Sequence, residues 1–181
     1  MHTQIKGKVT VNAPAEKVWQ IVAHDFEHIG QWASAIPTSF VNTNAPAVDG
    51  AAVGGRVCTN SVAGFDDIHE TFTYYDEAAM KFGYAATDGL PGFMEAAENN
   101  WSVKPVNANK CTVEARGEVD VKAFPGLFMF PFLKWQMGRI GKQTMEELKY
   151  FAEHGQPHPR KAKQAQNAKS SALNDFHIDI C

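Results

Sequence analysis

The sequence has few cysteines and no long apolar runs. Its 181 residues include three scattered cysteines, Cys58, Cys111 and Cys181, and none of them forms a Cys-x-x-Cys pair. This pattern excludes a disulfide framework and a zinc knuckle. No apolar run approaches the roughly 20 residues that a membrane-spanning helix needs. The N-terminal segment also lacks the apolar core of a signal peptide, so we expect a cytoplasmic protein without a transmembrane segment.

Basic residues are not in excess, and the common catalytic motifs are missing. The chain has 17 Lys and Arg against 20 Asp and Glu, a net charge of −3. A nucleic-acid-binding protein would need a basic excess, so no nucleic-acid partner is expected. There is no Gly-x-Ser-x-Gly elbow, P-loop or Gly-x-Gly-x-x-Gly motif, and no cofactor is expected. The segment His24–His28 fits His-x-x-Glu-His, but no third ligand is evident, so we assign no metal site.

Aromatic side chains, by contrast, are plentiful. The sequence holds 12 Phe, 4 Trp and 4 Tyr, and its proportions of hydrophobic (44%) and charged (20%) residues are typical of globular proteins. Aromatic residues in such number fill a core or line an apolar pocket. The length allows one domain and little more.

The chain divides into a body, residues 1–154, and a tail, residues 155–181. Gly155, Pro157 and Pro159 open the tail and are residues that stop a helix. The tail is polar and has few apolar residues before Phe176, so we expect it to be disordered.

The body predicts one α+β domain. Apolar residues alternate from Ile5 to Val11, which indicates a half-buried strand, and short helices are expected from Asn12 and around 25–32. A meander of antiparallel strands should follow, at 39–42, 56–62, 68–75, 80–86, 98–103 and 112–121. A long amphipathic helix, roughly 125–154, would then cover the inner face of the sheet, and Gly155 stands where a helix-ending glycine belongs.

This order of elements, with its motifs, resembles the SRPBCC superfamily. The matching segments are VTVNAPAEKVWQIVAHDFEHIGQW at the start, GGRV followed by IHETFTYYDE, ENNWSVKPV, and the closing helix. The superfamily includes START domains, birch-pollen-allergen-like proteins, polyketide cyclases/dehydrases and abscisic acid receptors. The resemblance implies a helix-grip fold over residues 1–154, with a curved antiparallel sheet wrapped around the long helix. It also implies a cavity for a hydrophobic small molecule.

Glu70 is the sharpest candidate for a functional residue. By alternation it shares a face with Phe72 and Tyr74, which we expect to point inward. A carboxylate there needs a partner, and Arg56 on the preceding strand is the natural one. Glu70 and Arg56 either anchor a ligand inside the cavity or form a structural ion pair. In abscisic acid receptors, as the resemblance implies, the matching Glu helps to bind the hormone.

Other residues could line the cavity, although aromatic members could equally be ordinary core residues. Asn100 and Ser102 share one strand face and Asn99, Trp101 and Val103 the other, and alternation does not say which points inward. Phe124–Leu133 is expected to be the mouth of the cavity, a membrane-touching lip or ordinary packing. The ligand-binding candidates are Arg56, Glu70, Phe72, Tyr74, Phe82, Tyr84, Asn100, Phe130, Leu133 and Met137.

Three functions follow from this interpretation. The first is binding of a hydrophobic small molecule, such as a lipid or polyketide, with transient membrane contact allowed. The second is a polyketide cyclase/dehydrase-type enzyme, in which Glu70 or Tyr84 transfers protons. The third is a protein-interaction module with a vestigial cavity and a tail that docks elsewhere. The sequence does not indicate the oligomeric state.

Overall fold

The computed structural model describes residues 1–59 and 66–175, with side chains except at 123–129 and 169–175. The first elements are β1 (His2–Val11), α1 (Ala15–Trp19), the π-helical turn η1 (Gln20–His24), the 3₁₀ helix η2 (Phe26–Gln31) and β2 (Ser39–Val41). The others are β3 (Gly55–Cys58), β4 (Ile68–Asp76), β5 (Lys81–Asp88), β6 (Met94–Asn107), β7 (Lys110–Val121), α2 (Ala123–His154) and α3 (Pro159–Asp175).

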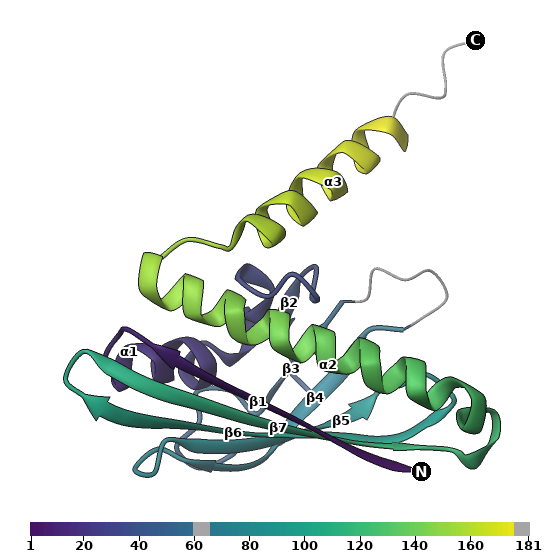
Figure 1. The fold of residues 1–181 in the computed structure, drawn as a ribbon, viewed down its shortest axis with the longest axis horizontal. Helices are drawn as coiled ribbons and strands as arrows, with labels where there is room; N and C mark the ends of the chain where they lie inside the picture. The colour runs from purple at the N-terminus through teal and green to yellow at the C-terminus, as the bar shows by residue number, and fades with distance from the viewer. Residues whose placement is uncertain (60–65, 176–181) are drawn as a thin grey trace.

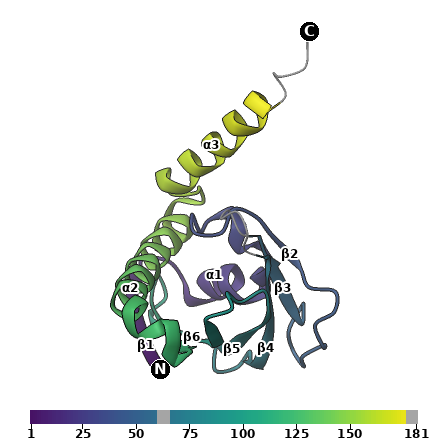
Figure 2. The ribbon, with the colours of Figure 1, turned by 90° about the vertical axis from the view of Figure 1, so that its right-hand side faces the viewer.

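The seven strands form one antiparallel sheet. Their order is β1-β7-β6-β5-β4-β3-β2. Strands β2 to β7 therefore form a meander, and β1 pairs with β7 at the edge opposite β2. The sheet curves around α1, and α2 lies across its concave side beside β1 (Figures 1 and 2). This is the predicted α+β helix-grip fold, with its short helices after the first strand and its long helix near the C-terminal end.

Helix α2 lies close to β1 because glycine stands at the contact. A Cβ atom on Gly7 would lie 3.0 Å from Cγ of Met145, so a larger residue would require the Met145 side chain to shift. The helix ends as predicted at Gly155, which adopts a left-handed φ of 69°. The Gly155 N–H donates a hydrogen bond to the carbonyl oxygen of Phe151 at 2.8 Å.

An aromatic cluster joins the short helices to the middle of the sheet. The rings of Phe26 on η2 and Phe72 on β4 lie 4.2 Å apart between centroids. Phe82 on β5 stacks on Trp101 of β6 at 6.1 Å, with the ring planes 7° apart. Trp19 of α1 packs on Phe82 as well. These rings are almost fully buried, so they hold the short helices on the concave face and fix one end of the interior.

The tail contains a helix where the sequence predicted disorder. α3 begins at Pro159, a residue favoured at the first helical position because its missing N–H has no helical partner there. The Ala, Lys and Gln residues that follow have high helix propensity. Pro159, one of the residues expected to stop a helix, therefore starts a new one, which projects away from the body (Figure 1). Residues 176–181 lie outside the described ranges.

Candidate functional site

A cavity of about 340 Å³ lies between the concave face of the sheet and α2. Its surface is mainly apolar. β1, β7 and α2 supply much of the lining, and the segment after η2 supplies another wall. The lining residues include Ile5, Gly7, Ala33, Ala35, Ile36, Arg56, Glu70, Tyr84, Asn99, Trp101, Ala115, Gly117, Met137, Ile140, Gly141, Thr144 and Met145.

The space arises because small residues lie on the inner face of the edge strands. Gly7 of β1 and Ala115 of β7 are cross-strand partners, and Gly117 follows on the same face of β7. Helix α2 presents Met137, Ile140, Gly141, Thr144 and Met145 to this space, at the i, i+3, i+4, i+7, i+8 spacing of one helix face. Small residues on the sheet opposite medium-sized side chains on the helix leave the volume unfilled.

Arg56 and Glu70 place an ion pair in the wall of this apolar cavity. They are direct cross-strand partners on β3 and β4, and Arg56 Nε donates to Glu70 Oε2 at 2.5 Å. Arg56 is 3% exposed, and its Nη1 donates to the Phe26 carbonyl at 3.0 Å. Its guanidinium also lies over the rings of Phe26 and Tyr84, 3.9 and 4.8 Å from their centroids. The predicted pairing of Arg56 with Glu70 is confirmed.

The two carboxylate oxygens of Glu70 differ in their hydrogen bonds to the described residues. Both hydrogen bonds that Glu70 accepts from described residues reach Oε2, one from Arg56 and a longer one, 3.6 Å, from the Cys58 thiol. Oε1 has no hydrogen-bond partner within the described part of the chain. As far as the described residues show, Oε1 can therefore accept a further hydrogen bond without breaking the ion pair with Arg56.

Burial and the charges of Arg56 and Glu70 shift the pKa values of the titratable groups in and beside this wall. Burial alone would lower the pKa of Arg56, but its interactions with Glu70, Tyr84 and Cys58 together more than offset this effect, and the pKa is raised. Burial raises the pKa of the Cys58 thiol to about 12, so Cys58 is not a thiolate nucleophile at neutral pH. Burial and the charge of Glu70 also raise the pKa of Tyr84, whose phenol stays protonated and can donate a hydrogen bond.

Strand β6 also contributes to the cavity wall, and the structure shows which face of this strand points inward. Asn99 and Trp101 face inward and line the cavity, so Asn100 and Ser102 face outward. The buried indole Nε1 of Trp101 has no hydrogen-bond partner among the described residues. Asn99 thus adds a polar side chain to the apolar wall, beyond the ion pair that the sequence predicted.

The predicted ligand-binding residues are distributed over three places. Arg56, Glu70, Tyr84 and Met137 line the cavity together. Phe72 and Phe82 instead belong to the aromatic cluster, at 5% and 1% exposure, and do not line it. Phe130 and Leu133, on the first half of α2, do not line it either.

The expectation that Tyr74 points inward is wrong, and the ligand-binding candidate Asn100 lies on the outward face. A β-bulge between Phe72 and Tyr74 breaks the alternation of β4, so Tyr75 packs against the core and Tyr74 turns outward. Tyr74 is 41% exposed, and a Cβ on Gly83 would meet both its ring and the side-chain oxygen of Asn100. The bulge leaves no mark in the alternating sequence.

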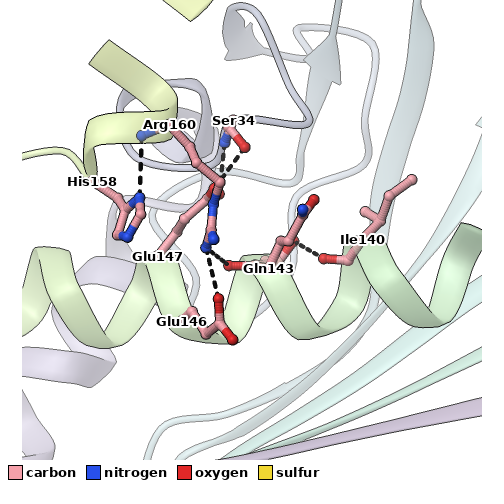
Figure 3. A network of polar contacts seen from close by, with 8 residues as sticks. Ser34, Ile140, Gln143, Glu146, Glu147, His158 and Arg160 are labelled. Carbon is pink, nitrogen blue, oxygen red and sulfur yellow. Dashed lines mark hydrogen bonds and ion pairs between the residues drawn. The ribbon is translucent and has the colours of Figure 1, made fainter. Parts of the chain in front are cut away.

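Sequence reasoning missed a polar network that fixes the wall after η2. Glu147 of α2 is buried, and its Oε1 accepts hydrogen bonds from Ser34 Oγ at 2.6 Å and from Arg160 Nε at 2.8 Å (Figure 3). Arg160 of α3 also binds Glu146 through Nη2 at 2.9 Å. Lys161 Nζ donates to the Ile36 carbonyl at 2.7 Å. The first turn of α3 therefore holds the segment that carries Ala33, Ala35 and Ile36.

The sequence carried one signal for this network. Glu147 follows Ile140 and Thr144 by seven and three residues, which places a carboxylate on the apolar stripe of the long helix. A buried carboxylate needs a cation or several donors. Its cation, Arg160, belongs to the segment that we expected to be disordered, so the pair could not be identified.

The expected mouth of the cavity, Phe124–Leu133, is described only in part. Its backbone belongs to α2, but the side chains of residues 124–129 lie outside the described part of the structure.

His24 of the His-x-x-Glu-His segment binds Glu77 through Nε2 at 3.0 Å. Among the described residues, no group of three or more His, Cys, Asp and Glu side chains is arranged to hold a metal ion. The helices of the described part include none with the length and apolar character to cross a bilayer.

Comparison with known proteins places the fold. Residues 2–153 match the family model described as polyketide cyclase/dehydrase and lipid transport. A START superfamily protein from Mycobacterium smegmatis is similar in structure, with a TM-score of 0.62 and 18% identity over 83% of this chain and 99% of that one. A protein from Thermus thermophilus has a TM-score of 0.66 and 12% identity, over 83% of this chain and 97% of that one. The structure of Ara h 8.0201 has a TM-score of 0.58 and 12% identity, over 82% of this chain and 98% of that one. No curated protein sequence matches the chain.

Proposed function

Because the chain belongs to the polyketide cyclase/dehydrase and lipid transport family, we propose that it binds a hydrophobic small molecule, such as a lipid or polyketide, between the sheet and α2. The observation that carries the proposal is an apolar cavity of about 340 Å³ whose wall contains one buried ion pair. Small-molecule pockets typically measure about 300–1,000 Å³ and combine apolar walls with a few polar groups.

The polar groups of the wall suit a ligand with an oxygenated end. Glu70 accepts a hydrogen bond from a hydroxyl, whereas the protonated phenol of Tyr84 donates one to a carbonyl. The apolar remainder of the ligand would lie along Met137 and Ile140 of α2. A lipid or polyketide with one oxygenated end fits this division between polar and apolar lining.

Native mass spectrometry of the freshly purified full chain, followed by titration with the neutral dye N-phenyl-1-naphthylamine, tests the proposal. We expect one bound hydrophobic molecule, or saturable 1:1 binding of the dye to the empty protein. Failure to bind the dye, together with no copurified molecule, would contradict the proposal. The dye is uncharged, so surface lysines do not attract it.

Catalysis is the second candidate, because Glu70 and Tyr84 line the same cavity. In a cyclase reaction Glu70 would act as the base, and Tyr84, which stays protonated at neutral pH, as a hydrogen-bond donor to a carbonyl oxygen. Incubation with a poly-β-carbonyl thioester, with the products resolved by mass spectrometry, tests this function. Glu70→Gln should abolish cyclisation, and a product mixture identical to the uncatalysed one would contradict an enzymatic role.

Two exposed aromatic residues suggest how a hydrophobic ligand is delivered. Phe132 and Trp135 of α2 are 61% and 59% exposed, and their ring centroids lie 5.9 Å apart. The Arg139 guanidinium lies 5.2 Å from the Trp135 ring. Aromatic rings beside a cation suit the interface of a lipid bilayer. We include transient contact of this helix face with a membrane in the proposed function.

A further inference from the structure

A second hollow lies on the convex face of the sheet, away from the cavity. It measures about 510 Å³ and crosses the strands from β4 to β1. One row of cross-strand neighbours runs Tyr74, Gly83, Asn100, Arg116, Lys6, and a second runs Lys81, Ser102, Glu114, Lys8. The short side chains of Asn100 and Ser102 lie in the middle, on β6, and the longer lining side chains come from β1, β4, β5, β6 and β7.

The hollow concentrates positive charge in a chain of net charge −3. Its described lining includes five basic residues, and Glu114 is the only carboxylate. Glu114 is already engaged, because it forms ion pairs with Lys8 at 3.0 Å and with Lys104. Lys6 and Lys81 have no ion-pair partner among the described residues. The hollow therefore keeps free cationic groups beside the hydrogen-bonding side chains of Asn100 and Ser102.

The register places two cations side by side, and only one of them has a carboxylate partner among the described residues. Lys6 and Arg116 stand directly opposite each other on adjacent antiparallel strands, and like charges in this position repel. Arg116 forms an ion pair at 2.5 Å with Glu118, which lies outside the hollow. No carboxylate among the described residues pairs with Lys6. A neutral residue at position 6 would fit a solvent-facing strand equally well. Two facing cations above a polar floor form the kind of site that binds a phosphate group.

We propose that this convex hollow binds a soluble small molecule that carries a phosphate group, with the phosphate between Lys6 and Arg116. The half-exposed Tyr74 ring, at the other end of the same row, offers a surface for the rest of the molecule. The proposal does not depend on the cavity or on its ligand, because the lining cations belong to the opposite face of the sheet.

NMR titration of the full chain with inorganic pyrophosphate tests the proposal, with sodium chloride at matched ionic strength as the reference. We expect saturable shifts at the amides of Asn100, Ser102 and Arg116 that chloride does not reproduce. Lys6→Gln should weaken binding about tenfold, since it removes a charge-assisted hydrogen bond. Lys17→Gln, an equal change of charge at an exposed position of α1, should bind like the wild type.

The Lys6→Gln variant also separates binding from folding. Without phosphate it should melt about 1–2 °C higher than the wild type at low salt, because it removes a facing like charge. Equal pyrophosphate binding by the wild type and Lys6→Gln would overturn the proposal. Shifts reproduced by chloride would overturn it as well. If pyrophosphate does not bind, but phosphatidylglycerol vesicles bind the wild type and not Lys6→Gln, the surface is a lipid contact and the proposal of a soluble ligand is wrong.

Discussion

Arg56 and Glu70 face each other across β3 and β4, where the buried guanidinium donates to the carboxylate at 2.5 Å. Glu70→Ala would leave Arg56 as a buried charge without its carboxylate. We expect a loss of about 3 kcal/mol in the free energy of unfolding, in the range found when one partner of a buried ion pair is removed. Urea unfolding measures this loss. Glu98→Ala, an exposed glutamate on β6, is the matched control and should change stability by less than about 0.5 kcal/mol.

The network around Glu147 predicts that the first turn of α3 is docked on the body, whereas the rest of the helix projects away from it. Arg160→Gln removes the cation from a carboxylate that is only 1% exposed, although Glu147 keeps the hydrogen bonds from the backbone N–H and the Oγ of Ser34. We expect a loss of about 1–3 kcal/mol, together with faster hydrogen exchange over residues 33–37 and 159–164. Lys163→Gln, an exposed lysine of the same helix, should leave exchange unchanged. Wild-type exchange rates in Arg160→Gln would mean that α3 does not support the cavity wall.

Glu77 predicts a pH dependence of stability. Partial burial would raise its pKa, but hydrogen bonds from Trp19, Tyr75 and His24 outweigh this and lower it. The folded-state pKa is therefore below the unfolded value of about 4.3. The stabilisation by Glu77 is complete above that value and is lost as the pH falls through the folded pKa.

Glu77→Gln should consequently destabilise the protein at pH 7 and less at about pH 3, which lies below the unfolded-state pKa of about 4.3, so that part of the stabilisation by the Glu77 charge is already lost there. Urea unfolding of both proteins at the two pH values measures the difference. Glu95→Gln, an exposed glutamate of β6, controls for general charge effects. A constant difference between wild type and Glu77→Gln at both pH values would show that these hydrogen bonds do not depend on the charge of Glu77.

The exposed pair Phe132 and Trp135 predicts a membrane-contact defect without a folding defect. Both rings are more than half exposed, so Phe132→Ala with Trp135→Ala should change the melting temperature little. Flotation with vesicles should show that the wild type binds and the double variant does not. Exposed Val106 on β6 offers a control, as Val106→Ala removes apolar surface elsewhere. Equal flotation of all three proteins would remove this face from the proposed function.

The sequence predicts the fold better than it predicts the site. Element order, the end of α2 at Gly155 and the pairing of Arg56 with Glu70 follow from helix punctuation and strand alternation, which are local patterns. Alternation misplaced Tyr74, because a one-residue bulge reverses the face of every residue after it.

Long-range packing accounts for the other differences. Phe72 and Phe82 have the inward direction expected of them, but the short helices cover them with Trp19 and Phe26, so they do not reach the cavity. The wall residues Ala33 and Ile36 lie in a segment with no regular pattern. Their position depends on Glu147 and α3, more than 100 residues away in the sequence.

Binding of N-phenyl-1-naphthylamine to a cavity-filled variant tests the central claim most directly. Met137→Trp places a larger side chain into the space between α2 and the sheet, whereas Lys142→Trp adds the same ring at an exposed position of α2. The account predicts saturable 1:1 binding by the wild type and Lys142→Trp, and binding at least about tenfold weaker in Met137→Trp, since filling a pocket removes the contacts that hold its ligand. Equal affinity of all three proteins for the dye would contradict the claim that this cavity is the ligand site.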